Sequence, residues 1–587
     1  MKTITKITLA LLLMSMTLFA NTPNLNKLQE LVKKVAQSEK MVLALDDKFP
    51  SRNTLTLESK EKLLLTTNSA ILEWKTNYKK MQTELQELSK SDDEKFQSKL
   101  NRYVERQEVL QDSYATYKSF IKQSKEDALK NITHYWEENL KTKTWYIDME
   151  NGSNSNDGLS DTTALERFEY LFSLNSIIAG DTILIMGEYK NVDFGDNNVW
   201  KDTPSIRLSN LHGTANNYIT IKPYDVNTVL KGDTVSIFRI LNCSYIQVEG
   251  FSIEGEVQNI SIATAKEYQF IYKNKKGKIK YRVKEGVSNA KIAKKKFKIL
   301  GSVTRPSYTS TKGLSVTDSH HINLVGNNIS YMPGAGLMVG GSDYINIVDN
   351  EVHHTSMRSY AGTHALVVHS SVSIDKKTGY KIKILRNRVH HNYNEIFSWS
   401  PFKPFITPHI DEGKGISLQK NSVKNGWVDG RILVANNIAY NNGFSGIHNN
   451  QGDRIDIFNN TCYMNSHSAV TGRNIGISSS DGTDIKIMNN IVQTDPKSLG
   501  YAISVVNNPK IKVFNNLIKG RLDSELDVDK TKTIIGEPRF VDEEGFDFRL
   551  ESDSDAQDQA KVLKSVPLDM DENIRDANSP DLGAFED

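Results

Sequence analysis

The chain has 587 residues, of which 38% are hydrophobic and 25% are charged. It is too long for one ordinary globular core, and its composition argues against wholesale disorder. A net charge of +2 disfavours a uniformly basic nucleic-acid binder, and two cysteines exclude both a disulfide framework and a Cys-rich zinc module. We therefore expect several modules or a repeat array, with no nucleic-acid partner.

Residues 1–20 have the features of a secretory signal peptide. Lys2 and Lys6 place positive charge before the uncharged apolar stretch Ile7 to Phe19, and Ala20 is a suitable small residue before a cleavage point. The stretch is short for a membrane span, and no later segment is long and apolar enough to be one. We expect a secreted or periplasmic protein with no membrane span in the mature chain; an uncleaved N-terminal anchor is the alternative.

Residues 21–143 have the pattern of an α-helical bundle. Apolar residues recur there with alternating steps of three and four, for example at Leu64, Ile71, Trp74, Tyr78, Met81, Leu85 and Leu88. This period is typical of the seam of a coiled coil or small bundle. Pro50 and the turn at Ser91–Asp93 divide the segment into three helices. We interpret it as an antiparallel bundle that acts as a spacer and could mediate oligomerisation.

From Trp145 the pattern changes to short β-type runs separated by Asn, Gly and Asp. Seven segments share the form apolar–x–apolar–x–x–Asn–x–apolar, with their Asn at Asn327, Asn350, Asn387, Asn436, Asn460, Asn490 and Asn516. A second column of Gly or Ala followed by an apolar residue precedes them, at Leu314, Leu337, Leu366, Ile416, Ile447, Ile477 and Ile503. Hairpins in a sandwich would not produce a constant Asn column.

Such coils predict a parallel β-helix. One coil cannot bury its apolar face, but coils stacked about 4.8 Å apart bury a continuous core and let the Asn side chains form a hydrogen-bonded ladder. We therefore expect a mainly β chain with this solenoid over residues 144–535 and an acidic C-terminal cap or tail over 536–587. A basic insert over 257–311 interrupts the coils.

The repeat resembles the right-handed parallel β-helix of the pectate-lyase-like superfamily. Trp145–Ile147 followed by Asn151–Gly158, together with Ala179–Ile183 and the closing Pro580–Glu586, is similar to secreted members. The resemblance covers about residues 145–587 and implies the fold and a carbohydrate ligand. The Trp-Ile-Asp-His motif of many pectate lyases, the polygalacturonase set and the alginate-epimerase motif Tyr-Gly-Phe-Asp-Pro-His are absent, so no catalytic residue is carried over. The superfamily also contains adhesins and phage-type glycan binders without activity.

Alignment of the coils places polar side chains on one sheet face. His364, Lys414 and Ser445 fall in one column just before the strand. A second, outward column contains His369, Gln419, Asn450 and Ser480, and His448 points to the same side. The longest coil adds a loop, residues 390–414, whose aromatic side chains suit stacking on sugars. We interpret this face as a catalytic groove; an ordinary solvated sheet face is the alternative.

A uronate lyase needs a cation that neutralises the sugar carboxylate, a base that removes the C5 proton and an acid that helps the 4-oxygen leave. The candidates for these roles are Lys414, His364, His369, His448 and Tyr360. We predict Lys414 as carboxylate neutraliser or base and His364 or His369 as base. The candidates for substrate binding are Arg358, Trp399, His409, Gln419 and Asn450.

These residues predict an exported lyase acting by β-elimination on an acidic polysaccharide. A non-catalytic glycan-binding surface protein, a glycoside hydrolase and an epimerase on the same fold remain alternatives. The segment from Thr264 to Arg305 holds 14 Lys or Arg and 2 Asp or Glu, a local charge of +12. We expect Lys294, Lys295 and Lys296 to bind the anionic polymer; a merely solvated hairpin is the alternative.

No cofactor is required by these patterns, although Asp411 and Glu412 could bind Ca²⁺, which prefers oxygen ligands. Two Val-His-His triples fall at equivalent positions of adjacent coils, with His353-His354 in one and His390-His391 in the next. Four imidazoles could bind a transition metal. A stacked polar ladder is the favoured interpretation.

Overall fold

The computed structural model describes residues 142–191, 204–267, 271–273, 279–281, 298–299, 307–359, 361–396, 410–468, 475–495, 497, 500–507, 510–521, 523 and 531–586. The predicted signal peptide and helical bundle lie outside these residues. Lys143–Asp587 forms one compact unit. Within the described ranges, no helix has both the length and the apolarity needed to cross a membrane.

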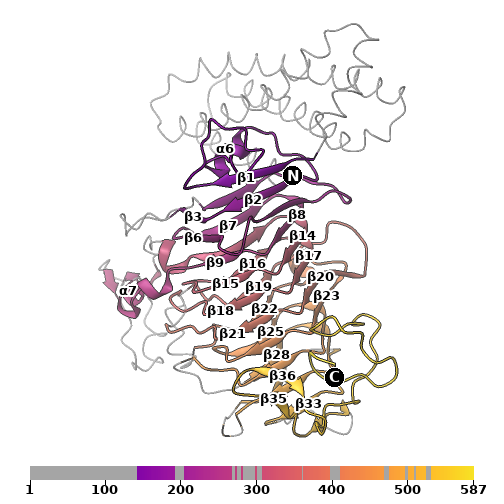
Figure 1. Ribbon diagram of the computed structural model, residues 1–587. Helices are drawn as coiled ribbons and strands as arrows, with labels where there is room; N and C mark the ends of the chain where they lie inside the picture. Colours follow the sequence, from indigo (N-terminus) through magenta and orange to yellow (C-terminus); the bar gives the residue numbers. More distant parts are fainter. Residues whose placement is uncertain are drawn as a thin grey trace, which may run out of the picture. The chain divides into compact units, whose positions relative to one another are not determined.

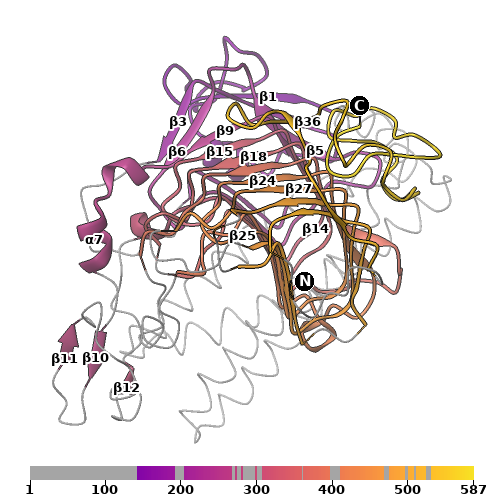
Figure 2. The same cartoon turned by 90° about the horizontal axis from the view of Figure 1, so that it is seen from below.

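The unit winds as a β-helix with three long sheets (Figures 1 and 2). Sheet A has eleven strands: β1 (Thr144–Asp148), β2 (Thr182–Met186), β5 (Ile219–Pro223), β8 (Ser244–Glu249), β14 (His320–Val325), β17 (Asp343–Val348), β20 (Tyr380–Leu385), β23 (Arg431–Ala435), β26 (Asp453–Phe458), β29 (Thr483–Met488) and β32 (Lys512–Phe514). Sheet B also has eleven strands: β3 (Glu188–Asn191), β6 (Val229–Gly232), β9 (Ser252–Glu254), β15 (Asn328–Ser330), β18 (Glu351–His353), β21 (Arg388–His390), β24 (Ile438–Tyr440), β27 (Thr461–Tyr463), β30 (Ile491–Gln493), β33 (Leu517–Lys519) and β34 (Ile534–Ile535).

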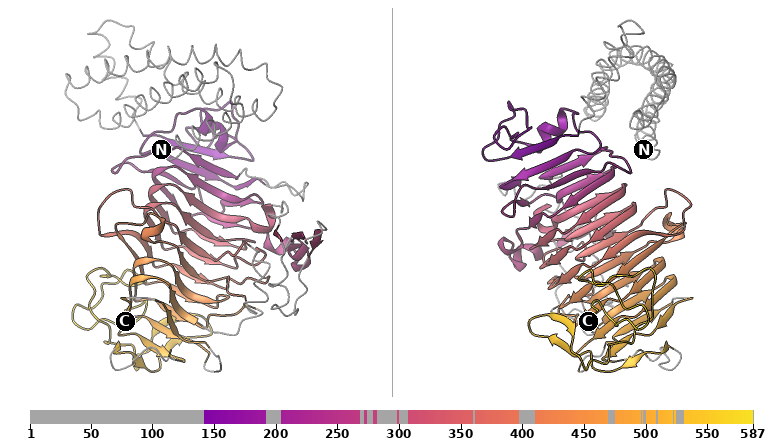
Figure 3. Two further views of the ribbon diagram at one scale, coloured as in Figure 1. Left: turned by 180° about the vertical axis from the view of Figure 1, so that it is seen from behind. Right: turned by 45° about the vertical axis from the view of Figure 1, so that its right-hand side comes forward.

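Sheet C has nine strands: β4 (Ile206–Ser209), β7 (Ser236–Leu241), β13 (Lys312–Thr317), β16 (Leu337–Gly340), β19 (Leu366–His369), β22 (Ile416–Gln419), β25 (Ser445–Asn450), β28 (Ile475–Ser480) and β31 (Ile503–Val506). Neighbouring strands within sheets A, B and C pair in parallel, and successive coils stack along one axis (Figure 3). The right-handed parallel β-helix predicted from the repeat is confirmed.

Alternation along the strands builds the core. In β14 the side chains of Ile322 and Leu324 are buried, whereas those of Asn323 and Val325 are half-buried on the outer face. The predicted Gly/Ala column lies at the corner before sheet C. A methyl group added to Gly336 would lie 2.4 Å from the Val352 side chain. Small residues therefore recur at this corner because the core of sheet B fills the space.

The Asn ladder forms, with one corrected member. Asn350 donates from Nδ2 to Oδ1 of Asn387 at 3.0 Å, and Asn387 in turn donates to Oδ1 of Asn437 at 2.9 Å. Asn436, which the repeat predicted, is therefore wrong for this coil. A bulge after Tyr380 pairs Ile382 with Ile432, so the repeat there begins one residue after Arg431.

The ladder makes a stability prediction at the corrected position. Asn437→Ala removes the acceptor for both the backbone N–H and Nδ2 of Asn387, which are buried. We expect the free energy of unfolding to fall by about 1–3 kcal/mol, measured by urea unfolding. Asn346→Ala is the matched control, because this amide lies half-buried on the outer face of sheet A, where water can replace it. An equal loss in both variants would contradict the corrected register.

Short helices and a small antiparallel sheet lie outside the three long sheets. Phe168 and Leu171 of α6 (Phe168–Ser173) join the core at the β1 end. The described part of the insert contains η3 (Val257–Asn259), α7 (Ile262–Glu267), the antiparallel strands β10 (Ile271–Lys273), β11 (Ile279–Tyr281) and β12 (Lys298–Ile299), and η4 (Ser307–Ser310). A further 3-10 turn, η5 (Val423–Asn425), follows β22.

The predicted His ladder is present on the outer side of sheet B and at the bend beyond it. The rings of His353 and His390 stack at 5.0 Å, and those of His354 and His391 stack at 5.4 Å. Within each coil the two Nδ1 atoms lie 2.8 Å apart. Phe546 packs edge-on against His391 at 5.5 Å. The stacked-ladder interpretation is therefore confirmed.

The ladder predicts acid sensitivity. Burial and neighbouring imidazoles lower the pKa of both His353 and His391 from 6.5 to about 4. Between these values the unfolded chain binds more protons than the folded chain, so the free energy of unfolding should fall as pH drops through this window. Urea midpoints measured across the window should show it. His391→Phe keeps a ring in the stack without a titrating group, so its pH dependence should be shallower; parallel curves would contradict the assignment.

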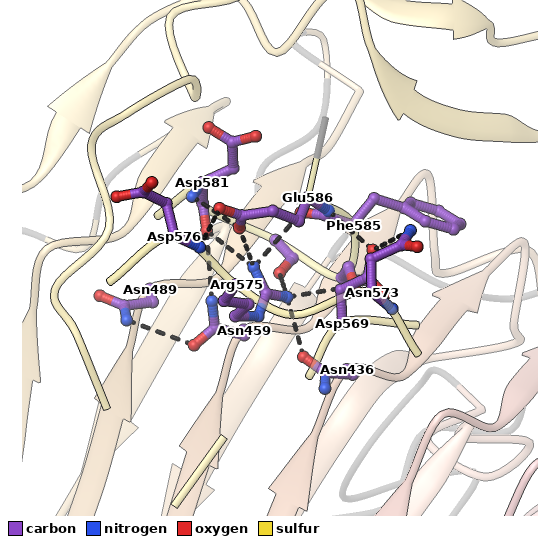
Figure 4. Close-up of polar contacts among 12 residues, drawn as sticks. Asn436, Asn459, Asn489, Asp569, Asn573, Arg575, Asp576, Asp581, Phe585 and Glu586 are labelled. Atoms are coloured by element: carbon purple, nitrogen blue, oxygen red, sulfur yellow. Dashed lines mark hydrogen bonds and ion pairs between the residues drawn. The ribbon is translucent and has the colours of Figure 1, made fainter. Parts of the chain in front are cut away.

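The C-terminal residues pack on the outside of the β-helix. After the hairpin β35 (Phe540–Asp542) and β36 (Asp547–Leu550), the chain returns over the bend between sheets A and B. Side-chain amides at this bend donate to backbone carbonyls of the returning segment, and they come from Asn436, Asn459, Asn489 and Asn515. Arg575 lies at the centre of these contacts (Figure 4). We call residues 556–586 the C-terminal clamp.

Candidate functional site

The outer face of sheet C brings some of the predicted residues together. Leu366 pairs with Ile416 and Ile416 with Ile447, which places His364, Lys414 and Ser445 in one column two residues before these paired positions. Strand pairing thus confirms the alignment of this column. His448 directly follows the buried Ile447. It pairs with Ser417 in the preceding coil and with Ser478 in the next coil.

Lys414 is the charged centre of this group. Only 6% of it is exposed, and Nζ donates to the backbone carbonyl of Asp411. Nζ also lies 5.1 Å from the centre of the Phe444 ring, where the negative face of the ring stabilises a cation. His364, in the preceding coil, is likewise 6% exposed. A buried ammonium beside an imidazole is thus held on the outer face of the sheet.

His448 completes the group through hydroxyl contacts. Its Nδ1 lies 2.7 Å from Oγ of Ser478, which lies 3.0 Å from Oγ of Ser445. Burial lowers the pKa of His448 well below its ordinary value, and the charge of Lys414 lowers it further, while Asp411 opposes the shift. The imidazole is therefore neutral at neutral pH. We name His364, Asp411, Lys414, Ser445, His448 and Ser478 the Lys414 cluster.

The second predicted column forms a polar strip that continues the outer face from the Lys414 cluster. His369 pairs with Gln419, and Gln419 pairs with Asn450. Gln419 accepts a hydrogen bond from Asn450 Nδ2 at 2.9 Å and donates at 2.6 Å to Oγ of Ser417, the strand partner of His448. The strip therefore adjoins the cluster at His448, and His369 lies at the far end of β19 (Leu366–His369) from His364.

His369 also has a local packing role. A methyl group on Gly340, its partner in the preceding coil, would lie 2.5 Å from Nε2 of His369, so the ring lies over this glycine. Burial lowers the pKa of His369, and the charges of Lys312 and Lys420 lower it further. The strip is accordingly uncharged, and it offers amide, hydroxyl and imidazole groups suited to sugar hydroxyls.

Arg358 is engaged by the protein. Its Nε donates to the carbonyl of Ile260 at 2.7 Å, and its guanidinium forms an ion pair with Glu395. Burial lowers its pKa. These contacts join the start of the insert to the segment after β21. We therefore assign Arg358 a structural role, and its contact with substrate stays a prediction.

Six further predicted site residues lie outside the described residues: Tyr360, Trp399, His409, Lys294, Lys295 and Lys296. Asp411 and Glu412 lie three and two residues before Lys414, and Glu412 is 6% exposed. Across the described parts of the chain, no group of three or more His, Cys, Asp or Glu is arranged to hold a metal ion. Ca²⁺ binding at Asp411 and Glu412 stays a prediction.

Sequence reasoning missed two members of this environment. Ser478 sits one residue after Ile477, as His448 sits one residue after Ile447, so extending the register by one coil would have found it. Phe444 directly precedes Ser445, but its contact with Lys414 depends on the path of the turn. Repeat alignment carries information about strand positions and little about turns.

Comparison with known proteins yields fold relatives alone. No protein-family description and no curated protein matches the sequence. A GH136 lacto-N-biosidase from Eubacterium ramulus has 12% identity and a TM-score of 0.31, covering 77% of this chain and 64% of that one. A periplasmic alginate epimerase has 14% identity and a TM-score of 0.26, covering 60% and 68%. An alginate lyase from Paenibacillus sp. str. FPU-7 has 12% identity and a TM-score of 0.28, covering 65% and 99%.

The chain spans less than two thirds of the length of the biosidase. Similarity at this level carries no argument about chemistry. The β-helix is established by the strand pairing of the chain itself.

Proposed function

We propose that this protein is an exported enzyme that cleaves an acidic polysaccharide by β-elimination at the Lys414 cluster. The observation that carries the proposal is Lys414, a residue that is 6% exposed and lies in register with His364 on the outer face of sheet C. A cation held out of water interacts more strongly with an anion than an exposed one does. A sugar carboxylate is the ligand class that this position favours.

The roles follow from charge development. When the C5 proton of a uronate leaves, negative charge accumulates on the carboxylate, and Lys414 neutralises it. His364, one coil away, removes the proton as general base, because a neutral imidazole accepts protons near neutral pH. The predicted alternative base, His369, lies at the far end of β19 from His364, and we assign it to sugar binding. Tyr360 remains the predicted acid for the leaving oxygen.

A glycoside hydrolase is the second candidate. Asp411 and Glu412 supply two carboxyl groups in the segment that precedes β22, and hydrolysis of a glycosidic bond requires such a pair at a working separation. The two reactions differ in their products. β-Elimination creates a double bond conjugated to the carboxylate, whereas hydrolysis adds water and leaves a saturated sugar.

The test is a panel of acidic polysaccharides incubated with the full-length protein. Pectate, alginate and glycosaminoglycans are followed for ultraviolet absorbance of the unsaturated product and, in parallel, for new reducing ends. Both signals rising together support the lyase. Reducing ends without absorbance favour the hydrolase, and binding with neither signal favours a non-catalytic glycan-binding protein or an epimerase.

A further inference from the structure

The Lys414 cluster contains a hydrogen-bonded chain of two hydroxyls and one imidazole. Ser445 and His448 belong to β25, and Ser478 belongs to the neighbouring strand β28. Ser445 is 0% exposed and Ser478 is 7% exposed. The contacts run from Ser445 Oγ to Ser478 Oγ at 3.0 Å and from Ser478 Oγ to His448 Nδ1 at 2.7 Å. Buried hydroxyls in such a chain need a consistent direction of donation.

The direction determines where the imidazole carries its proton. If Ser445 donates to Ser478 and Ser478 donates to Nδ1 of His448, both buried hydroxyl hydrogens are used. Nδ1 is then an acceptor, and the single proton of the neutral ring must lie on Nε2. In the opposite direction Nδ1–H would donate to Ser478 and Ser478 to Ser445, which would leave the hydrogen of the most buried hydroxyl without a partner inside this chain.

We propose that Ser445 and Ser478 are positioning residues that hold His448 as the neutral Nε2–H tautomer, so that His448 acts as a hydrogen-bond donor. The proposal rests on the proposed function, because the group that would receive this hydrogen bond is the carboxylate of the bound uronate. Lys414 and His448 then stabilise the same developing charge, one as a cation and one as a neutral donor. No proton is transferred from His448, and His364 remains the base.

The arrangement has a chemical reason. A second cation beside Lys414 would be costly, because two positive charges would repel each other in a site shielded from water. A neutral imidazole that donates from Nε2 adds stabilisation where charge develops without that repulsion. Ser478 supplies orientation, because it fixes both the ring angle and the nitrogen that carries the hydrogen.

The first test reads the tautomer directly and needs no substrate. In the full-length protein labelled with ¹⁵N-histidine, long-range ¹H–¹⁵N spectra at neutral pH distinguish a protonated from an unprotonated ring nitrogen. His448→Gln assigns the signals. We expect the proton on Nε2 in the wild type and a mixture of tautomers in Ser478→Ala, with Ser478→Thr restoring the wild-type pattern. A proton on Nδ1 in the wild type would overturn the proposal whether or not the protein is a lyase.

The second test uses the activity. On a substrate that yields the unsaturated product, Ser478→Ala should lower kcat about tenfold, the effect of one hydrogen bond, with little change in KM. Ser315→Ala is the matched control and should leave kcat unchanged, because Ser315 is also a buried serine of sheet C, bonded to Ser236 Oγ at 2.8 Å, and its strand β13 lies four strands away from β25. A changed tautomer with unchanged kcat would overturn the positioning role. If Ser478→Ala fails to fold, Ser445→Ala serves in both tests. Absence of turnover on every substrate would count against the proposed function and leave the spectroscopic result standing.

Discussion

Lys414→Met is expected to lower kcat for β-elimination about 10²–10³-fold while the fold persists. The ammonium would face a carboxylate whose charge increases as the C5 proton leaves, so its stabilising effect is larger in the transition state than in the bound substrate. Methionine preserves the alkyl stem next to Phe444 and removes the charge. Initial rates from the absorbance of the unsaturated product measure the effect.

A second lysine of the same coil provides the control. Lys420 is exposed at the left-handed turn that follows β22, with φ of 55°, so Lys420→Met should retain wild-type turnover. Thermal unfolding of both variants checks that the coils remain stacked. Full activity of a folded Lys414→Met protein would show that the reaction takes place elsewhere on the molecule.

The parts of the fold that repeat were accessible from sequence, and the reason is geometric. Each ladder Asn and each corner Gly or Ala contacts its equivalents one coil away, so one spacing rule applies to many residues. The rule fails where two registers compete. Ala435-Asn436-Asn437 offers two Asn in sequence, and the register that starts at Ile432 fits the repeat without the break at Arg431.

The residues of the candidate site divide in the same way, into those whose positions the repeat determines and those whose positions depend on the turns. The column of His364 and Lys414 followed from register, because parallel strands keep equivalent residues adjacent. The choice between His364 and His369 as base was left open by the sequence, because both fall on the same outer face of sheet C. The ion pair of Arg358 with Glu395 was not accessible, because it joins turns whose paths have no repeat. Long-range contacts of the C-terminal clamp belong to this second class, since Arg575 bonds Asn436 across 139 residues.

Arg575 holds the C-terminal clamp by contacts that no other side chain could reproduce. Its side chain is 5% exposed and pairs with Glu586 at 3.0 Å. The other terminal nitrogen donates to Oδ1 of Asn436 at 2.9 Å and to the carbonyl of Gly583 at 2.8 Å. Further carbonyls accept from the guanidinium at Asp581, Ala584 and Phe585. One buried charge thus fastens the end of the chain to the bend between sheets A and B.

Arg575→Met should therefore reduce the free energy of unfolding by about 3–5 kcal/mol, the loss typical when one partner of a buried ion pair is removed. Glu586, whose side chain is 10% exposed, would lose its partner, and the carbonyls would lose donors that water cannot readily replace. Urea unfolding followed by circular dichroism measures the loss, and faster proteolysis near the C-terminus should accompany it. Arg549→Met is the control, because Arg549 forms an exposed pair with Asp547 and its loss should cost about 1 kcal/mol or less. Similar destabilisation in the two variants would mean that the clamp adds little to the stability of the β-helix, and that its coils are held by the core and the Asn ladder alone.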